Sequence, residues 1–539
     1  MTKMNHKILL GAAITLASLQ QAYAVPFAPS DARSMGMGGT GVASAEVAST
    51  VQFNPALLAT TREDDHFGLK LPQFSLAVAD DNGFIDEAED FDEESELAPG
   101  SDKTNIDLLS DLLEDVTDNG IPTLEAALDD IDQAVTPAQF QTAQTNLNAA
   151  IAGLDGQLFS TNVNLDPDLV VYSDAIASDL EDLNNKALRI NGGLNIAGAI
   201  PSKKFSMAVH AGAQVTFSGR VIVSSDDTGI LRNYSAATSA YLGAVNDLSA
   251  ALTAVNTGGT TAAELTALQA AQEAVDDFNY GGAGRPESEG DTAIFVGGEL
   301  SPEAEDADLD SEIQMIGVAV ADVGVTASRV FNIKGHDISF GITPKLQKIS
   351  IFDYTHPLDG KDENGNDVEF DSEDFSENQE DYTAFNIDLG AAYQFGAEKQ
   401  WQAGLVIKNL IGDDYESAEY ISSNGVGGAV VSISPMMRAG ISHRTSWTKV
   451  AFDLDITEND PVAFEDPTQY AAIGGELNVW RIVQLRAGYR ANLAGSDQDI
   501  MTAGIGISPG PVHLDIGVMA NTSDIENEAG IALEFGVEF

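Results

Sequence analysis

The sequence contains no cysteine, few basic residues and no apolar run of the ~20 residues that a membrane-spanning helix requires. The absence of cysteine excludes disulfides, thiolate metal sites and cysteine-based catalysis. The 84 acidic residues far outnumber the 26 basic ones, and the formal net charge is −58. A nucleic acid is therefore not expected as a direct partner, because its phosphates would be repelled.

Residue patterns typical of active sites are also missing. The chain has no G-x-S-x-G motif, which presents the nucleophile of many lipases and esterases. Its seven histidines are scattered, and none lies at the spacing of metal ligands. We therefore expect no enzyme activity, no metal and no cofactor. Two acidic stretches, DDNGFIDEAE (80–89) and DENGND (362–367), are either acidic turns or opportunistic sites for divalent cations.

The first residues predict export. Lys3 and Lys7 precede a short apolar run, and Ala22-Tyr23-Ala24 has the small-x-small pattern of a cleavage site. We assign residues 1–24 to a signal peptide. An exported chain without disulfides must be stabilised in another way.

Apolar and polar residues alternate in many segments. At the C-terminus, Ile531, Leu533, Phe535, Val537 and Phe539 alternate with small or acidic residues, as in a strand with one apolar face. The same pattern occurs in residues 205–217, 385–395, 401–407, 450–456, 483–489 and 512–518. A soluble sandwich would expose the polar face to water, whereas an outer-membrane barrel turns the apolar face to lipid. The export signal, the strand lengths and the glycines and mixed charges of the second face favour the barrel.

Short and long connections alternate between these strands. Short links are expected at 201–204, 332–337, 396–399, 445–446, 480–481 and 509–511. Longer, acidic connections are expected at 79–186, 219–311, 353–381, 412–428, 458–468, 493–498 and 521–528. Short periplasmic turns and longer outer loops are typical of outer-membrane proteins. Residues 61–539 are therefore predicted to form an all-β, antiparallel transmembrane barrel of about 14 strands, with both termini in the periplasm.

The two longest connections, 79–186 and 219–311, contain helical patterns. Apolar stripes at helical spacing are formed by Leu108, Leu109, Leu112 and Leu113, and by Leu124, Ala127, Leu128 and Ile131. Residues 235–277 are rich in alanine and show a similar pattern. We expect acidic helical lobes outside the membrane.

The face that would line the lumen carries charges of both signs. They are Arg189, His210, Lys345, Asp388, Lys408, Arg438, Asp453, Asp455, Arg486, Arg490, Asp515, Glu534 and Glu538. These charges either form a conduction path or pair across the lumen and hold a plug.

Residues 25–60 precede the first strand and are the candidate hatch, or plug. A barrel of 14 strands is too wide for its own side chains to fill. Its small residues include Gly36, Gly38, Gly39 and Gly41, and Asn54-Pro55 precedes the first strand. Small residues let the backbone pack closely on a wall, and the residue before a proline favours an extended turn. A flexible linker is the alternative, although it would carry fewer apolar residues. Arg33 is expected to pair with a wall acid such as Asp453 or Glu534.

Three stretches resemble known barrel proteins. ARSMGMGGTGVASAEVASTVQFNPALLA (32–59) resembles the N-terminal hatch of the FadL-type long-chain fatty acid transporters. The resemblance implies that the hatch residues are Arg33, Gly36, Gly38, Gly39, Gly41, Asn54, Pro55 and Ala56. WQAGLVIKNLIGDDY (401–415) and LRAGYRANLAG (485–495) are similar to a FadL-type branch named after the conjugal plasmid transfer protein TraF. The resemblance implies a plugged, fourteen-stranded outer-membrane barrel that passes hydrophobic molecules. The TraF name implies a part in conjugation.

Two functions follow as hypotheses. The first is a gated passive channel for hydrophobic small molecules, and the second is a non-transport surface component of a conjugal transfer or protein-export system. The expected partners are outer-membrane lipid and lipopolysaccharide, the barrel-assembly machinery, and either a hydrophobic ligand or conjugation-apparatus proteins. The terminal strand, with Phe535, Val537 and Phe539, resembles the signal that the assembly machinery recognises.

Overall fold

The computed structural model describes most of the chain. The described residues are 22–24, 31–60, 66–80, 82–92, 103–115, 120–134, 136–158, 169–258, 261–305, 310–358, 378–418, 420–422, 425–461, 463–464, 467–480, 482–495, 499–523, 525 and 527–538. Most of the predicted signal peptide, the stretch 362–367 and Phe539 lie outside them. Within the described residues, no helix combines the length and the apolar character needed to cross a membrane.

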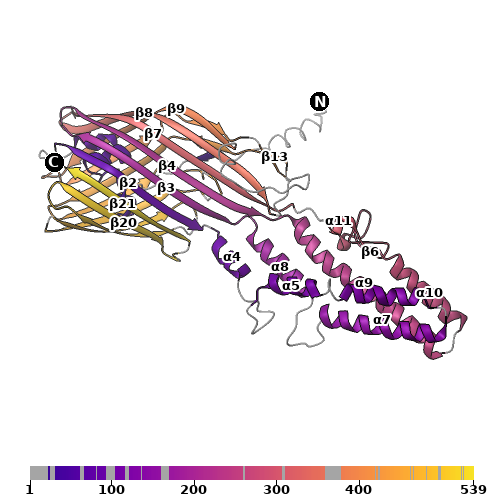
Figure 1. The fold of residues 1–539 in the computed structure, drawn as a ribbon. Helices are drawn as coiled ribbons and strands as arrows, with labels where there is room; N and C mark the ends of the chain where they lie inside the picture. The colour runs from indigo at the N-terminus through magenta and orange to yellow at the C-terminus, as the bar shows by residue number, and fades with distance from the viewer. Residues whose placement is uncertain are drawn as a thin grey trace, which may run out of the picture.

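Fourteen antiparallel strands close into a barrel (Figure 1). In order around the barrel they are β10 (Trp401–Lys408), β15 (Met436–Arg444), β16 (Thr448–Asp455), β17 (Tyr470–Val479), β18 (Val483–Asn492), β19 (Ile500–Ile507), β20 (Val512–Asn521), β21 (Glu528–Glu538), β2 (Gly68–Asp80), β3 (Ala187–Ile200), β4 (Ser206–Ile222), β7 (Glu312–Ile333), β8 (His336–Pro357) and β9 (Gln379–Phe395). The ring closes where β2 pairs with β21. The predicted strand number and antiparallel arrangement are confirmed.

The barrel is apolar outside and polar inside. On β18, Leu485 is 46% exposed on the outer face, whereas the neighbouring Arg486 is only 7% exposed and faces the lumen. A soluble protein would show the opposite arrangement, with arginine at the surface and leucine in the core. The alternation seen in the sequence therefore separates a lipid-compatible surface from a polar lumen.

Short links connect the strands at one end of the barrel, which we call the short-turn end. The other end, the long-loop end, carries the long connections, including both helical insertions (Figure 1). The three tryptophans of the chain, Trp401, Trp447 and Trp480, lie in or beside short links and are 38%, 60% and 86% exposed. Exposed tryptophans at one level of a barrel are typical of the aromatic girdle at a membrane interface.

The inner face of β8 changes from polar to apolar along its length. From the short-turn end, its buried, inward-facing residues are Ser339, Gly341, Thr343, Lys345, Gln347, Ile349 and Ile351. The outer face changes in the opposite sense, from the exposed Phe340 and Leu346 to the exposed Lys348. This reversal marks the level at which β8 leaves the apolar belt and enters water.

Beyond that level, chain from two long connections packs on the inner faces of β7 and β8. Strands β11 (Asp413–Glu416) and β14 (Val430–Ile433) form a small sheet, and Ala463 and Phe464 lie beside it. Its apolar side chains cover Ile349 and Ile351. We call residues 413–416, 430–433 and 463–464 the outer layer. The connection predicted at 412–428 is therefore not only an outward loop, because its strand β11 is part of a buried layer.

The helical insertions form a lobe at the long-loop end (Figure 1). Its helices are α4 (Phe84–Asp92), α5 (Asn105–Asp115), α6 (Ile121–Asp132), α7 (Pro137–Leu158), α8 (Leu169–Leu183), α9 (Ser225–Gly258) and α10 (Ala262–Asp276). The predicted stripe residues Leu124, Ala127 and Ile131 are buried in the lobe core together with Leu248 and Leu252 of α9. The lobe thus has an apolar core of its own.

Other short elements lie outside the barrel strands, the helical lobe and residues 31–60. They are β1 (Ala22–Ala24), which pairs with β14 and lies within the predicted signal peptide, β12 (Tyr420–Ser422), β13 (Gly425–Gly427), β5 (Phe295–Val296), β6 (Glu299–Leu300), η4 (Glu287–Glu289) and α11 (Pro302–Glu305).

Candidate functional site: the inner segment and the barrel wall

Residues 31–60 lie inside the barrel, in its short-turn half, and we call them the inner segment (Figure 1). Four short helical pieces make up the segment: α2 (Ala32–Met35), η1 (Val47–Ser49), α3 (Thr50–Phe53) and η2 (Pro55–Ala59). Asp31 caps α2 by accepting a hydrogen bond of 2.7 Å from the Ser34 backbone N–H. Gly38 and Gly39 have φ of +72° and +86°, so the reversal after α2 uses backbone conformations that glycine adopts without strain.

The segment lies against a belt of wall glycines. Four cross-strand pairs face it: Gly341–Gly390, Gly404–Gly440, Gly474–Gly488 and Gly504–Gly517. A Cβ placed on Gly488 would lie 2.8 Å from Gly38 Cα, and one on Gly504 would lie 3.1 Å from Gly36 Cα. The first distance is shorter than real Cβ contacts and the second is tighter than most of them, so the missing side chains on the wall let the two backbones approach closely.

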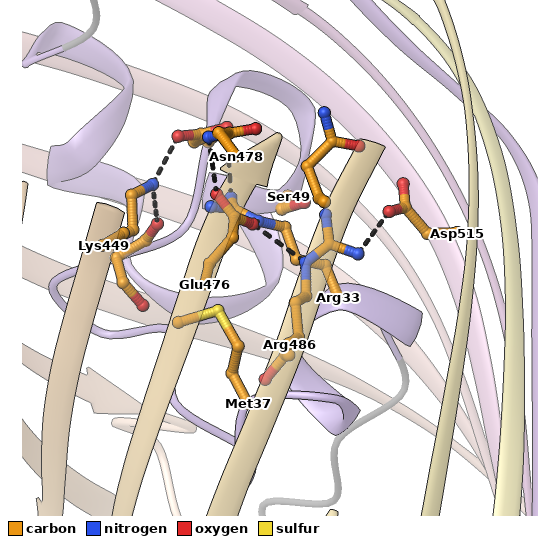
Figure 2. A network of polar contacts seen from close by, with 12 residues as sticks. Arg33, Met37, Ser49, Lys449, Glu476, Asn478, Arg486 and Asp515 are labelled. Atoms are coloured by element: carbon orange, nitrogen blue, oxygen red, sulfur yellow. Dashed lines mark hydrogen bonds and ion pairs between the residues drawn. The ribbon is translucent and has the colours of Figure 1, made fainter. Parts of the chain in front are cut away.

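Arg33 joins the segment to the wall (Figure 2). Its guanidinium Nε donates to Glu476 of β17 at 2.8 Å, and Nη1 lies 3.2 Å from Glu46 of the segment itself. Glu476 also accepts from Arg486 of β18 at 2.9 Å, and Arg486 pairs with Asp515 of β20. A continuous chain of ion pairs therefore runs from the segment across three wall strands.

A second ionic contact holds the start of the segment. Lys70 of β2 pairs with Asp31 and, at 2.7 Å, with Glu534 of β21. The register of β2 shifts between Lys70 and Gln73, as in a β-bulge, so both of these side chains point inward and are almost completely buried. Gln73 in turn donates to Gln52 of the segment at 3.3 Å. The bulge thus provides two anchors where a regular strand would provide one.

Hydrogen bonds to backbone groups hold the rest of the segment. The Asp453 carboxylate accepts from the backbone N–H groups of Gly41 at 2.7 Å and Val42 at 2.9 Å. Asn54 donates to the Val42 carbonyl at 3.0 Å and accepts from the Ala56 N–H at 3.0 Å. The Ala56 carbonyl accepts from Ser339 of β8 at 2.6 Å. Backbone groups that a short, irregular segment cannot satisfy by itself are thereby paired with the wall.

The ionisation of the segment follows from these partners. Burial alone would raise the pKa of Asp31, but Lys70, the Ser34 N–H and the Ser49 hydroxyl lower it well below its usual value. Burial opposes the charge of Arg33, but Glu46 and Glu476 raise its pKa well above the usual value. Both groups are therefore charged at neutral pH, and each depends on its partners to remain so.

A polar chamber separates the segment from the outer layer. It measures about 80 Å³ and is bounded by Phe53 and Gln52 of the segment and by Ile433 of the outer layer. Its wall includes the ion pair Lys345–Asp388, with Nζ and Oδ1 3.0 Å apart. The lumen therefore has three zones along its axis: the ionic inner segment, the polar chamber and the apolar outer layer.

The outer layer reaches across the barrel mouth. The guanidinium of Arg220, on β4, lies 4.2 Å from the centre of the Phe464 ring, which comes from the connection between β16 and β17. The buried Asp353 of β8 accepts from the Ala429 N–H at 2.8 Å and from Ser417 at 3.0 Å. These contacts fix the layer and its flanking residues to β4 and β8, which are separated in the barrel by β7 alone.

The predicted hatch residues all lie in the inner segment, and one detail is wrong. Arg33 pairs with Glu476 and not with Asp453 or Glu534, because those two carboxylates bind the Gly41–Val42 backbone and Lys70. Pattern reasoning also missed Asp31, Lys70 and the glycine belt. The available signal was the repeated glycine at inward positions of successive strands.

Other predicted sites fall outside the segment. Asp80 accepts from the N–H groups of Phe84 and Ile85 at 2.6 and 2.7 Å, so in the described part of stretch 80–89 it caps α4, as an acidic turn would. Phe535 and Val537 lie on β21 with Phe535 exposed on the outer face, and Phe539 lies outside the described residues. The thirteen predicted lumen charges are on the inner face, buried or partly buried.

The fold is that of an outer-membrane β-barrel with a filled, polar lumen. The chain matches the family described as "F plasmid transfer operon, TraF, protein" over residues 51–455, and it belongs to that family. The predicted TraF resemblance is confirmed, and the match includes the stretch 401–415 but not 485–495. No curated protein matches the chain.

Several solved structures are similar. The toluene transporter TbuX of Ralstonia pickettii is 10% identical, with coverage of 97% of this chain and 99% of that one and a TM-score of 0.41. A FadL homologue of Pseudomonas aeruginosa is 10% identical, with coverage of 96% and 99% and a TM-score of 0.40. The toluene transporter TodX of Pseudomonas putida is 10% identical, with coverage of 96% and 98% and a TM-score of 0.38.

Proposed function

We propose that the protein is a gated outer-membrane channel and that the inner segment is its plug. The observation that carries the proposal is the contact between the segment and the wall, where glycines on both sides let the backbones touch and buried ion pairs hold the segment in place. A flexible linker would need neither feature. In the described state the channel is closed.

We place the barrel in the outer membrane with its short turns in the periplasm. The exposed apolar residues of the strands form the lipid surface, and the three tryptophans mark its periplasmic boundary. Lipid and lipopolysaccharide are then the partners of the outer face. In this orientation the lobe is extracellular, which suits its acidic surface.

The terminal strand is proposed as the handle for the barrel-assembly machinery. Phe535 and Val537 are two residues apart on β21 and therefore share one face of the strand. This strand must pair with β2 to close the ring. Deleting Phe539 is expected to lower the amount of protein in the outer membrane and to increase periplasmic degradation, measured by fractionation and immunoblotting at native expression. Unchanged surface levels would argue against this role.

The cargo is the finer part of the proposal. The family resemblance implies a hydrophobic small molecule, but such a cargo would have to pass a chamber that contains Lys345, Asp388 and Asp322. A small polar solute would find hydrogen-bond partners there. Comparing the uptake of an aromatic hydrocarbon and of a sugar of similar size by cells with and without the protein separates the two cargo classes.

A disulfide between segment and wall tests the gate. A Cβ on Gly68 of β2 would lie 3.4 Å from Cβ of Ala48, close to the spacing of about 3.5–4.5 Å found in disulfides. Because the chain has no cysteine, Ala48→Cys with Gly68→Cys gives one possible cross-link. Val47→Ala is added, since Val47 Cγ1 would lie 2.5 Å from the new Cβ.

We expect the oxidised double-cysteine protein to lose channel openings in planar bilayers and to regain them on reduction. Each single-cysteine variant in the Val47→Ala background is the matched control and is expected not to respond to reduction. Equal conductance in the oxidised and reduced states would show that the segment does not move during opening, and it would overturn the gate.

A role in conjugation is the second candidate function. It is favoured by family membership and by the lobe, which has its own core and holds much of the chain's acidic surface. The test is the conjugation frequency of a deletion strain complemented with the full-length or the lobe-deleted protein. A loss of transfer with normal channel activity would support this role for the lobe.

A further inference from the structure

A group of charged residues surrounds an open cavity at the short-turn end of the barrel. The cavity measures about 520 Å³ and is bordered by the short links at Ser446 and Pro511. Five carboxylates line it: Glu46, Glu476, Asp515, Glu534 and Glu538. Arg33, Arg486 and His513 complete its charged lining. This cavity is several times larger than the polar chamber above the segment, which measures about 80 Å³.

The charges around this cavity do not balance. Following the ion pairs outward from the lining adds Lys70, Lys449 and Asp31. The connected set then holds six carboxylates and four cations, which leaves two negative charges when His513 is neutral. Buried carboxylates that are not compensated are strongly unfavourable. A bound cation would offset this excess of negative charge.

Two of these carboxylates face each other on the wall, although each also pairs with a cation, Asp515 with Arg486 and Glu534 with Lys70. Asp515 of β20 lies directly opposite Glu534 of β21, and like charges in directly opposed positions are destabilising. His513 is two residues before Asp515, so both side chains lie on the same, inward face of β20. His513, Asp515 and Glu534 each offer one potential ligand atom, and these three atoms lie within 4.8 Å of one another.

One of these atoms also lacks a partner. Glu534 is 3% exposed, and its Oε1 binds Lys70 at 2.7 Å and lies 3.3 Å from His513 Nε2. Its Oε2 has no hydrogen-bond partner within the described chain. A buried carboxylate oxygen is rarely left in this way unless an ion or water binds it.

We infer that His513, Asp515 and Glu534 form a binding site for a divalent metal ion at the periplasmic mouth of the barrel. One imidazole nitrogen and two carboxylate oxygens suit Zn²⁺ better than Mg²⁺ or Ca²⁺, which prefer all-oxygen sites. The open cavity leaves room for water to complete the coordination. A divalent cation would also supply the missing two charges. This inference does not depend on whether the barrel conducts.

The test uses the full-length protein in detergent after treatment with a chelator. Isothermal titration with ZnCl₂ is expected to show one Zn²⁺ per chain, whereas MgCl₂ at the same concentration should give no heat of binding. Co²⁺ provides a second probe, because its visible absorption changes when nitrogen and oxygen side chains coordinate it. Removing a ligand is expected to weaken Zn²⁺ binding by at least ~10-fold.

His513→Ala is the primary variant, and His513→Gln preserves more of the side-chain volume if the first does not fold. His443→Ala is the matched control, since His443 lies on β15 against the Trp401 ring, away from the site. Zn²⁺ binding that is lost in both His513 variants and kept in His443→Ala supports the site. Absence of Zn²⁺ binding, or equal affinity in the wild type and the His513 variants, would overturn it and leave protons as the neutralising charges.

Discussion

The inner segment and the helical lobe are held in place by opposite means. The segment has almost no core of its own, and its charged groups and backbone amides are satisfied by the barrel wall. The lobe packs apolar side chains from two separate insertions around Leu147, Leu248 and Leu252, which are fully buried. One element therefore depends on the barrel for its structure, whereas the other carries its core with it.

Charge follows the same division. The insertions 81–186 and 223–311 together contain 42 of the 84 acidic residues but only 4 of the 26 basic ones. Water solvates that excess outside the barrel, so the lobe requires few ion pairs. Inside the lumen, solvation is limited, and each charge of the segment has an opposite partner within 4 Å. Removing the segment is therefore expected to leave charges of the barrel wall without their partners, whereas removing the lobe is not.

The largest expected effect comes from removing both closures of the lumen. Deleting residues 27–58 removes the segment, and a short glycine–serine link in place of 411–434 removes β11 and β14 from the outer layer. Lys408 and Met436 are paired at this point, so a short link can join their strands. Because the remaining lumen is polar, we expect it to fill with water and give large, steady conductance in planar bilayers.

Each single deletion provides the control. With residues 27–58 removed alone, the outer layer still covers Ile349 and Ile351, and we expect a smaller and less regular conductance. If that single deletion conducts as well as the double one, the outer layer is not a barrier. Both deletion variants must show heat-modifiable migration on gels, which verifies that the barrel has folded.

The next effect is that of removing one buried cation. Lys70→Met leaves Asp31 and Glu534 buried without their shared partner, and breaking a buried pair in this way costs about 3–5 kcal/mol. We expect faster hydrogen exchange in residues 31–60 and leak conductance in planar bilayers. Lys348→Met is the matched control, because the Lys348–Asp381 pair is 59% and 46% exposed and is largely screened by solvent. Equal exchange in the two variants would contradict the anchoring role of Lys70.

A smaller effect is expected at the glycine belt. Gly474 and Gly475 are neighbours on β17, but they face opposite sides of the wall. A Cβ on Gly474 would lie 2.6 Å from Met37 Cβ, whereas one on Gly475 would have only the Lys449 carbonyl at 4.0 Å. Gly474→Ala is therefore expected to cost about 1–3 kcal/mol by overpacking and to loosen the segment. Gly475→Ala should behave as the wild type in protease digestion from the periplasmic side, and a similar response in both would argue against close packing.

Much of the fold could be predicted because lipid and lumen impose a period of two on each strand. Leu485 and Arg486 illustrate the rule, since each must face a different solvent. The rule fails at Ile349 and Ile351, which face inward like Lys345 but are covered by the outer layer. Periodicity identifies a face of a strand, but it does not show what covers that face.

The contacts of the candidate site were less predictable. The glycine-rich stretch indicated close packing, but the partner of Arg33 depends on barrel register and on the turn at Gly38–Gly39, which no local pattern encodes. Lys70 faces inward together with Gln73 only because of a bulge at Leu71–Pro72. These residues meet across hundreds of positions in sequence, so the single sequence contains no local signal of their pairing.

The smallest effect is expected from removing the lobe. Asp80 and Leu188 are paired where β2 and β3 meet, as are Ile222 and Glu312 where β4 and β7 meet, so short links can replace residues 82–186 and 224–310. We expect unchanged bilayer conductance and heat-modifiable migration, because the ion pairs of the segment in the described part of the chain join it to the barrel wall or to itself. Leu252→Ala is the companion variant: its cavity should destabilise the lobe by about 2–5 kcal/mol while the segment stays protected from exchange. If either change opens the channel or exposes the segment, the lobe and the plug are coupled, and the separation between the two regions is wrong.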